Sequence, residues 1–512
     1  MFVDGVDVLL VAPPRLMWPY INAYDNFMVP QNLPCLAGYI RAKGIKKVAI
    51  IDCMPLKMGW KTLIRTIKNL KPKILAAGEN HALFSVEVLK LFRYAKEILP
   101  DIVTVAGGTH FSFLAEDILK NEDSVDYIVI GEGEETFLEL CQAILSGCEK
   151  KDMRKVKGIA FKDDGEIVIT EPRPLIKNLD DLPIPAYDLL PMDKYGKSKY
   201  LFASWGSTIH HSRGCTSSCD FCSFWIQMAD VKIQNGKKKL IPRWRTKSPE
   251  RTFEEVKYLV KNFGRYFLVW VDDTFNVNPK WEDEFSELIL KSNTKTRWYC
   301  FMRADYILRD EELGIMEKLV KAGLQHISIG AERAEDEDFT ELNKPFYSTE
   351  ILSECINLIR EKYPHVFVQM TFLTGLRNDS RKTFRKILEF AKKLSPDYAG
   401  FHPITPFPGT KLYEQYKEYI ELTDWNYYDL NTPVMGTKYL QREEVEELTA
   451  ELYRKFVNLK WFLKGILGGD YRRKMYIWWL IVTMKITLSS IFNLKMPFNE
   501  YHNLIYPPWY YD

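Results

Sequence analysis

Three cysteines lie within eight residues near the middle of the chain. Cys215, Cys219 and Cys222 form a C-x3-C-x2-C pattern, with Phe221 directly before the third cysteine. Thiolates at this spacing can each bind one iron of a cubic [4Fe–4S] cluster. No fourth cysteine follows at short range, so one iron would lack a protein ligand and could bind a small molecule through an amine and a carboxylate. An open coordination position distinguishes a reactive metal centre from a closed structural one.

These cysteines could also bind a structural zinc ion or form disulfides. A structural zinc site needs a fourth ligand, and His210 and His211 lie just upstream. A disulfide framework fits the chain less well, because the remaining cysteines are scattered without a paired pattern. They are Cys35, Cys53, Cys141, Cys148, Cys300 and Cys355. The first five residues show no basic stretch followed by an apolar core, so we expect no signal peptide and a reducing, cytoplasmic location.

Composition places the chain among soluble globular proteins. Its 512 residues predict about three domains. Apolar content of 46% and charged content of 27% are ordinary for this class. A net charge of +2 argues against a polyanionic partner such as a nucleic acid.

Residues 1–145 alternate short apolar runs with amphipathic stretches. This alternation predicts βαβ units and a doubly wound parallel sheet. The expected strands are Val6–Ala12, Lys47–Asp52, Lys73–Gly78, Ile102–Gly107 and Tyr127–Gly131. In such sheets a ligand binds beyond the carboxyl ends of the strands.

Glycine-rich loops follow several of these strands. A glycine after a strand is often only a turn, but four loops in succession on one edge, the first being Pro13-Pro14, favour a ligand. The candidate binding residues in the other three loops are Gly78, Gly108, Thr109, His110, Gly131, Glu132 and Gly133.

Residues 146–200 read as a connector, with a hairpin around Asp163-Asp164-Gly165 and a proline-stiffened linker. Residues 201–412 show a second βα alternation, which predicts a partial α/β barrel. Its expected strands are Thr208–Ser212, Phe267–Asp272, Thr296–Arg303, His326–Gly330, Val366–Phe372 and Tyr398–Thr405. The three cysteines follow the first of these, at the carboxyl face where barrel chemistry occurs.

The alternation of strands and helices ends before residues 413–512, whose pattern predicts a mostly helical region. Arg442–Lys464 reads as one long helix. Tyr476–Phe492 is apolar and aromatic, yet it contains Lys485 and is shorter than the ~20 residues of a spanning helix. Residues 472–492 either contact a membrane interface, with Trp478 and Trp479 at headgroup level, or form a helix packed on the barrel or over its mouth. We favour the packed helix.

The cysteine motif, Phe221 and the following βα barrel resemble the radical SAM superfamily. Residues 326–332 resemble the family's fourth-strand segment that contacts S-adenosylmethionine (SAM), and residues 406–410 resemble the segment that closes the barrel. The N-terminal region, with residues 106–110 and 131–134 in order, resembles the cobalamin-binding domain of the cobalamin-dependent branch. That branch includes the class B radical SAM methylases and the anaerobic magnesium-protoporphyrin ester cyclases.

Two departures from the family patterns bear on these expectations. Cobalamin proteins that bind cobalt through histidine carry Asp-x-His-x-x-Gly, whereas this chain has Asp52-Cys53-Met54, so we expect no histidine on the cobalt. Residues 375–380 replace a frequent Gly-x-Pro-x-Glu, which concerns loop geometry rather than the fold. The second barrel strand ends in Asp272-Asp273, a pair that this branch often has.

The resemblance implies three cofactors: a [4Fe–4S] cluster on Cys215, Cys219 and Cys222, SAM on its open iron, and cobalamin. It places Phe221 near the adenine of SAM, for which simple packing is the alternative. It also suggests that Arg303 and Glu332 contact SAM, with an ion pair between barrel strands as the alternative. Asp273 would position substrate or a SAM hydroxyl, unless it only caps a helix.

The implied activity is methylation of an unactivated carbon. A 5′-deoxyadenosyl radical removes hydrogen from the substrate, methylcobalamin delivers the methyl group, and two SAM are used per turnover. The substrate would be a peptide or protein side chain, or a lipid. The alternative is a cyclase or oxidoreductase acting on a tetrapyrrole or membrane lipid, whereas a non-catalytic cobalamin sensor would not need the cysteines. A ferredoxin or flavodoxin would supply electrons to a monomeric enzyme.

Overall fold

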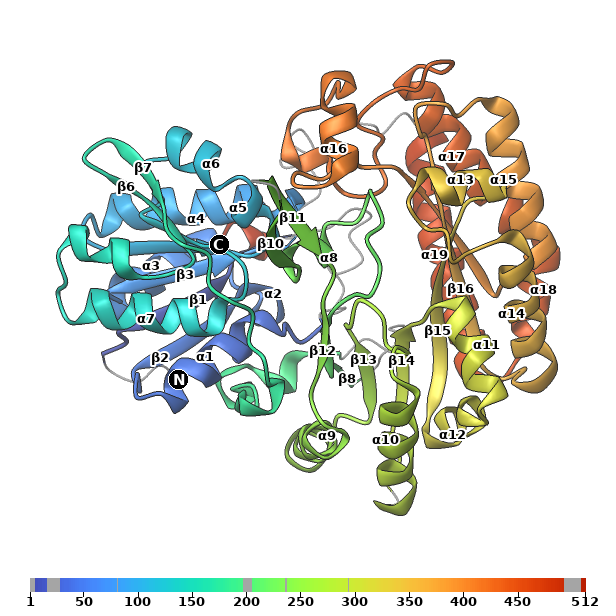
Figure 1. Cartoon of the computed structure of the whole chain (residues 1–512), viewed down its shortest axis with the longest axis horizontal. Helices are drawn as coiled ribbons and strands as arrows, with labels where there is room; N and C mark the ends of the chain where they lie inside the picture. The colour runs from blue at the N-terminus through green and yellow to red at the C-terminus, as the bar shows by residue number, and fades with distance from the viewer. Residues whose placement is uncertain are drawn as a thin grey trace.

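The computed structural model describes residues 5–15, 28–80, 82–196, 205–234, 237–292, 294–491 and 508–512. Two sheets lie side by side, each with helices packed against it (Figure 1). The chain ends next to the N-terminal sheet, where the backbone N–H of Thr62 donates to a terminal oxygen of Asp512 over 2.6 Å.

The N-terminal sheet has seven strands in the order β2-β1-β3-β4-β5-β6-β7. The first five are parallel, and their apolar runs are buried because helices cover both faces. Their bounds are β1 (Val8–Ala12), β2 (Val48–Asp52), β3 (Ile74–Gly78), β4 (Val103–Gly107) and β5 (Tyr127–Val129). The helices are α1 (Asn32–Ala42), α2 (Cys53–Leu56), α3 (Trp60–Leu70), α4 (Ser85–Ile98), α5 (Thr109–Phe113), α6 (Ala115–Asn121) and α7 (Gly133–Leu145).

The hairpin predicted in the connector is present as β6 (Ile159–Asp163) and β7 (Glu166–Ile169). It pairs antiparallel with β5 and so extends the N-terminal sheet. All five predicted strands of this region are therefore confirmed, and the hairpin adds two more at one edge.

The second sheet is the predicted partial barrel, with six parallel strands in the order β17-β16-β15-β14-β13-β8. The strands are β8 (Gly206–Ile209), β13 (Phe267–Trp270), β14 (Arg297–Phe301), β15 (Leu324–Glu332), β16 (Phe367–Thr374) and β17 (Tyr398–Pro403). The helices between them are α9 (Pro249–Phe263), α10 (Pro279–Ser292), α11 (Ala304–Glu312), α12 (Ile315–Ala322), α13 (Asp336–Glu341), α14 (Thr349–Lys362) and α15 (Arg381–Leu394).

Short elements near the cysteines were not predicted. After β8 the chain forms β9 (Ser212–Gly214), the cysteine loop and α8 (Phe224–Gln227). A hairpin of β10 (Asp230–Gln234) and β11 (Lys237–Ile241) follows, and β12 (Trp244–Thr246) returns to pair with β9. These strands are too short for a periodic pattern to reveal them.

Two predicted helices are wrong in their extent. The sequence pattern of residues 310–322 predicts one helix from Asp310 to Ala322, but the chain forms α11 and α12, which are divided at Gly314, whose φ of +70° lies in the left-handed region. The expected Arg442–Lys464 helix is divided into α17 (Arg442–Phe456) and α18 (Leu459–Ile466). The Asn458 side chain accepts a hydrogen bond from the Trp461 backbone N–H and so begins a new helix.

The last long helix, α19 (Asp470–Ile491), packs at the end of the barrel where the strands begin. The Tyr471 hydroxyl lies 2.9 Å from His326 Nδ1, and the Trp479 ring stacks on Tyr398 with centroids 3.7 Å apart. For the described side chains this confirms the packed helix, at the end opposite the cysteine loop rather than over the mouth. Among the described helices, none combines the length and apolar character needed to cross a bilayer.

Candidate functional site

The cysteine loop lies at the carboxyl end of the barrel strands. Cys219 is buried, Cys215 and Cys222 are half-buried, and all the cysteines of the chain are free thiols. Burial raises the pKa of Cys219 to about 11, and the nearby Lys344 ammonium only partly offsets this effect. Binding of a metal cluster must therefore displace a proton from this thiol.

The donor set of this loop fits an iron–sulfur cube better than zinc. His211 lies away from the loop, with its Nδ1 2.8 Å from Asp272 and its ring 3.9 Å from that of Trp281. Across the described part of the chain, no three His, Cys, Asp or Glu side chains converge on a point where one metal ion could bind. Thiolates that bind separate irons of a cube do not need to converge in this way.

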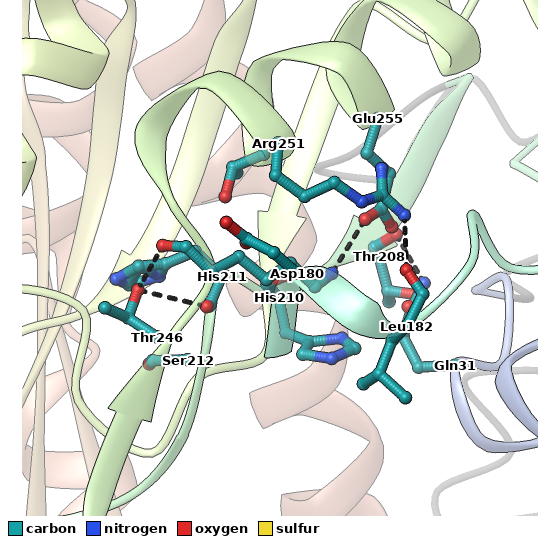
Figure 2. Close-up of polar contacts among 12 residues, drawn as sticks. Gln31, Asp180, Leu182, Thr208, His210, His211, Ser212, Thr246, Arg251 and Glu255 are labelled. Carbon is teal, nitrogen blue, oxygen red and sulfur yellow. Dashed lines mark hydrogen bonds and ion pairs between the residues drawn. The ribbon is translucent and has the colours of Figure 1, made fainter. Parts of the chain in front are cut away.

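Asp272 anchors the strand that leads into the cysteine loop. Its buried carboxylate accepts hydrogen bonds from the backbone N–H groups of His211 and Ser212, over 3.0 and 2.6 Å, and from the Ser212 hydroxyl over 2.6 Å. On the other side, the Thr246 hydroxyl donates to the His211 carbonyl over 3.2 Å (Figure 2). Asp272 therefore positions the backbone ahead of Cys215.

The same region joins the barrel to the rest of the chain. The Gln31 amide donates to the Thr208 carbonyl of β8 over 2.7 Å, and Arg251 of α9 donates to the Leu182 carbonyl over 2.9 Å (Figure 2). The first barrel strand is thus fixed against the N-terminal domain, and α9 is fixed against the connector.

Arg303, the residue directly before α11, holds the cysteine loop. Its guanidinium donates to the Ser217 hydroxyl over 2.7 Å and forms an ion pair with Asp305 over 2.6 Å. It also lies over the rings of Phe346 and Tyr306, 3.5 and 4.1 Å from their centroids. The ion-pair partner Asp305 lies on α11, so this contact is not the ion pair between barrel strands that was the alternative. Contact between Arg303 and SAM stays a prediction.

Glu332 lies at the carboxyl end of β15, close to the cysteine loop. Its φ of +58° is unusual for a residue with a side chain, and its carboxylate lies 2.8 Å from the buried Lys344 ammonium. The neighbouring Asn343 donates to the Ser218 carbonyl over 2.7 Å. Asn343 and Lys344 therefore connect the cysteine loop to β15, and a contact between Glu332 and SAM stays a prediction.

Two further predicted residues lie at the mouth of the barrel. Phe221 packs against a cluster of Leu342, Leu376, Ile404, Leu412 and Met435. The Asp273 side chain is exposed just after β13. The contacts of Phe221 with adenine and of Asp273 with a ligand remain predictions.

The glycine loops of the N-terminal sheet meet one another at its carboxyl edge. A Cβ atom at Gly78 would lie 2.6 Å from the Gly107 carbonyl oxygen, and one at Gly108 would lie 2.4 Å from the Glu79 carbonyl oxygen. Gly108 and Gly131 have φ of +91° and +79°, which favours glycine at both positions. The space around Gly131 is open.

His110 is buried in the loop after β4, between the rings of Phe111 and Trp425. Burial lowers its pKa to about 4, so the imidazole is neutral. Its Nδ1 atom has no hydrogen-bond partner among the described residues. A buried polar atom without a partner at the carboxyl edge of the sheet fits a bound polar ligand such as the side chains of a corrin.

Gln227 joins the cobalamin-type loops to the cysteine loop. It lies on α8, five residues after Cys222, and its side-chain oxygen accepts a hydrogen bond from the Thr109 hydroxyl. Its amide donates to the Gly131 carbonyl over 3.4 Å. The two predicted cofactor sites are therefore connected through one side chain.

Glu132 serves the contact between the two domains. Its carboxylate oxygens lie 3.0 Å from Arg213 and 2.9 Å from Arg245, and it also accepts from the Ile176 backbone N–H over 2.7 Å. Glu134 pairs with the same Arg213 over 2.5 Å. Because these interactions engage both oxygens of Glu132, a contact with cobalamin stays a prediction, as does one for Gly133 at the start of α7.

Sequence reasoning missed Gln227, Arg213 and Arg245. Arg213 lies two residues before Cys215, and this position next to the motif was the only available signal. Gln227 and Arg245 contact residues about a hundred positions away, so no local pattern could identify them.

Comparisons with known proteins agree with this arrangement. The Radical SAM superfamily profile matches residues 209–391, and the B12 binding domain profile matches residues 17–141. An anaerobic magnesium-protoporphyrin IX monomethyl ester cyclase of Rubrivivax gelatinosus is 30% identical over 465 residues, which are 90% of this chain and 79% of that protein. An uncharacterized methyltransferase of Pyrococcus horikoshii is 30% identical over 456 residues, 88% of this chain and 92% of that protein.

A more distant relative and two solved structures extend the comparison. A hopanoid C-3 methylase of Methylococcus capsulatus is 25% identical over 80% of this chain and 74% of its own. The cobalamin-dependent SAM radical enzyme OxsB superposes with a TM-score of 0.68 at 16% identity, over 96% of this chain and 75% of that chain. The methyltransferase TsrM from Kitasatospora setae, with cobalamin and a [4Fe–4S] cluster bound, superposes with a TM-score of 0.65 at 15% identity. The match covers 95% of this chain and 100% of that chain.

The two solved structures confirm the predicted fold, and the profiles and relatives confirm the predicted family and cofactors. The chain therefore belongs to the cobalamin-dependent radical SAM enzymes, whose cofactors are a [4Fe–4S] cluster, SAM and cobalamin.

Proposed function

We propose that this enzyme is a C-methyltransferase that replaces a hydrogen on an unactivated carbon of its substrate with a methyl group. The observation that supports this proposal is the hydrogen-bond connection from Thr109 and Gly131 through Gln227 to the cysteine loop, since it would hold a methyl carrier beside the radical source. The cofactors supply radical generation and methyl transfer. Each turnover would use two SAM and two electrons, and release the methylated product, S-adenosylhomocysteine, 5′-deoxyadenosine and methionine.

The residues of the chain would supply geometry and a dry chamber. Arg303 and Asn343 hold the cysteine loop through Ser217 and Ser218, over 2.7 Å in each case. Cys215, Cys219 and Cys222 would bind the cluster. The burial of Cys219 and the covering loops would limit the access of water to the radical.

The inner wall of the barrel supports an apolar substrate. Trp298 of β14 is buried on the helix side, in contact with Trp270 and Phe285, so alternation directs Phe301 toward the opposite side, the barrel interior. Val271, just beyond β13, and Phe301 are 42% and 41% exposed there. Ser328 pairs with Phe301 in the sheet and Gln369 with Ser328, so small and polar side chains complete the wall. In this proposal the two exposed apolar side chains would contact a lipid substrate.

The test uses SAM with an isotopically labelled methyl group. Reconstituted enzyme with reductant is incubated separately with magnesium-protoporphyrin IX monomethyl ester, with a hopanoid and with a peptide mixture, and products are examined by mass spectrometry. We expect label in a product carbon, with S-adenosylhomocysteine and 5′-deoxyadenosine formed together. Formation of 5′-deoxyadenosine with an unlabelled product two hydrogens lighter would instead identify a cyclase.

The cyclase is the second candidate, because the Rubrivivax relative that bears this name covers 90% of the chain. Cysteine substitution does not separate the two candidates, because Cys219→Ala removes a cluster ligand from both. It does separate them from a cobalamin sensor, which would keep its function in the Cys219→Ala variant.

We further propose that a ferredoxin or flavodoxin donates the electrons and that the enzyme is a monomer. It would be cytoplasmic and would contact a membrane peripherally near residues 472–492.

A further inference from the structure

The outer faces of α18 and α19 carry exposed apolar side chains. On α18 and its C-terminal cap, Leu459, Leu463 and Leu467 are 72%, 53% and 88% exposed. Their spacing of four residues places them in one stripe along the helix. Ile477, Ile481 and Met484 form a similar stripe on α19, with exposures of 39%, 38% and 52%. We call these six residues and the lysines beside them the α18–α19 face.

The opposite sides of both helices are fixed to the barrel. The Trp461 indole N–H donates to the Asp397 carbonyl over 2.7 Å, and its ring stacks on Tyr476 with centroids 4.3 Å apart. The Tyr476 hydroxyl donates to the Asp397 carboxylate over 3.1 Å, and Arg472 pairs with the same carboxylate over 3.0 Å. The exposed stripes therefore contribute little to the packing of these helices.

Positive charge is concentrated around the same stripes. Residues 459–491, which include α18 and α19, contain six Lys and Arg and a single Asp, whereas the whole chain has a net charge of +2, so the remainder is net negative. Lys460 and Lys464 are exposed and lie beside the leucine stripe of α18, and Arg473 and Lys474 are exposed on α19. Apolar side chains flanked by lysines on one helix face match the surface of an anionic bilayer.

We propose that the α18–α19 face docks on the surface of a membrane that contains anionic lipids. The leucine stripe enters the boundary between headgroups and acyl chains, and Lys460 and Lys464 meet lipid phosphates. Trp479 has no part in this contact because it stacks on Tyr398. The leucines of α18 therefore take the place that the sequence reasoning gave to the tryptophans.

The position of this face leaves the reaction site open. Tyr471 and Trp479 of α19 contact His326 and Tyr398, which lie near the beginnings of β15 and β17, whereas the cysteine loop follows the carboxyl ends of the strands. A docked enzyme would thus present the mouth of its barrel away from the bilayer. The proposal does not depend on whether the reaction is a methylation or a cyclisation.

Vesicle sedimentation tests the proposal with the reconstituted full-length enzyme. We expect binding to phosphatidylcholine vesicles that contain phosphatidylglycerol, weak binding to pure phosphatidylcholine, and a loss of binding at high salt. The double variant Leu463→Ser/Leu467→Ser should bind these vesicles at least about tenfold more weakly, because the apolar contact of two inserted leucines is lost. Lys460→Glu/Lys464→Glu should lose the preference for the anionic vesicles. Leu313→Ser is the matched control, since Leu313 is 58% exposed elsewhere on the barrel.

Three results would overturn the proposal. One is equal binding by the wild type and the leucine double variant, with thermal unfolding of both unchanged. Another is the absence of wild-type binding to anionic vesicles. The third is a wild-type dimer in sedimentation equilibrium that Leu463→Ser/Leu467→Ser converts to a monomer, which would make this face an interface between copies of the chain. If the leucine variant does not fold, the lysine variant decides. Methyl-transfer activity is measured separately and does not bear on the outcome.

Discussion

The carboxylate of Glu132 and the guanidinium of Arg245 form a two-pronged ion pair, with N–O distances of 2.9 and 3.0 Å, between the N-terminal domain and the barrel. Both side chains are largely buried, and Arg213 approaches the same carboxylate from the strand ahead of the cysteines. The N-terminal domain and the barrel are thus joined by one acidic residue that faces two basic ones.

Replacement of Glu132 should loosen this interface. In Glu132→Gln the two arginines lose a buried counter-charge, which should cost about 3 kcal/mol or more of stability. We expect a lower midpoint of thermal unfolding and faster proteolysis between the domains. The matched control is Glu135→Gln on the same helix, where the carboxylate is 43% exposed and 3.7 Å from Arg173. Equal midpoints for the two variants would contradict a role of Glu132 in joining the domains.

Gln227→Ala should separate radical formation from methyl transfer. The variant loses the hydrogen bonds to Thr109 and Gly131 but keeps the cluster ligands. We expect 5′-deoxyadenosine to form at the wild-type rate while transfer of labelled methyl falls about tenfold or more, because the two sites lose their mutual alignment.

Gln227→Glu tests the same link more finely. It keeps the acceptor for Thr109 and removes the donor to Gly131, so methyl transfer should be intermediate. A parallel loss of both activities in Gln227→Ala would show that the residue supports the cluster loop alone.

Arg303→Lys should weaken the cysteine loop. Lysine lacks the fork that bonds Ser217 and Asp305 together, so we expect less iron per protein and faster loss of the cluster in air, with little change in the KM for SAM. Arg297→Lys at the exposed start of β14 is the control. A raised KM for SAM with full iron content would instead show that Arg303 contacts SAM, as the family resemblance implies.

Glu87 should make the stability of the protein depend on pH. Burial raises its pKa from 4.5 to about 7, and its Oε2 atom has no hydrogen-bond partner among the described residues. The folded state therefore holds more protons than the unfolded state between these values, so stability falls as pH rises from about 4.5 to 7, by about 3 kcal/mol in total.

The variant Glu87→Gln should abolish that fall and should be the more stable protein above pH 7. Unfolding curves at several pH values measure it, with Glu97→Gln at an exposed position of α4 as the control. An unchanged pH profile in Glu87→Gln would mean that another group causes the dependence.

Phe301→Ser should impair recognition of an apolar substrate. The variant loses exposed apolar area at the inner wall, so the KM of the substrate should rise about tenfold, while Phe301→Leu should remain close to the wild type. The measurement uses whichever substrate carries label in the methyl-transfer test. A lower KM in Phe301→Ser would indicate a polar substrate and would contradict the proposed class.

Periodicity and motif spacing in the sequence alone determined most strands of the two sheets and the cysteine motif. Strands of a parallel sheet are buried on both faces and therefore need a continuous apolar run, such as residues 8–12. Such a run is a local feature, so it can be recognised in the sequence. Likewise, the spacing of Cys215, Cys219 and Cys222 is a property of one loop, so the cluster motif is visible in the sequence. The helix breaks at Gly314 and Asn458 were missed because the apolar periodicity continues through both positions. The signal of a single helix-capping residue is weaker than that of the periodic pattern around it.

Only the tertiary structure decided how the two cofactor sites are joined. The ion pair of Glu132 with Arg245 spans more than a hundred residues, as does the placement of Tyr471 under the barrel. Such contacts arise from the packing of whole sheets and helices, and no local spacing encodes them. The three cysteines therefore predict a cluster site by themselves, whereas the hydrogen bonds of Gln227 to Thr109 and Gly131 arise only in the folded chain.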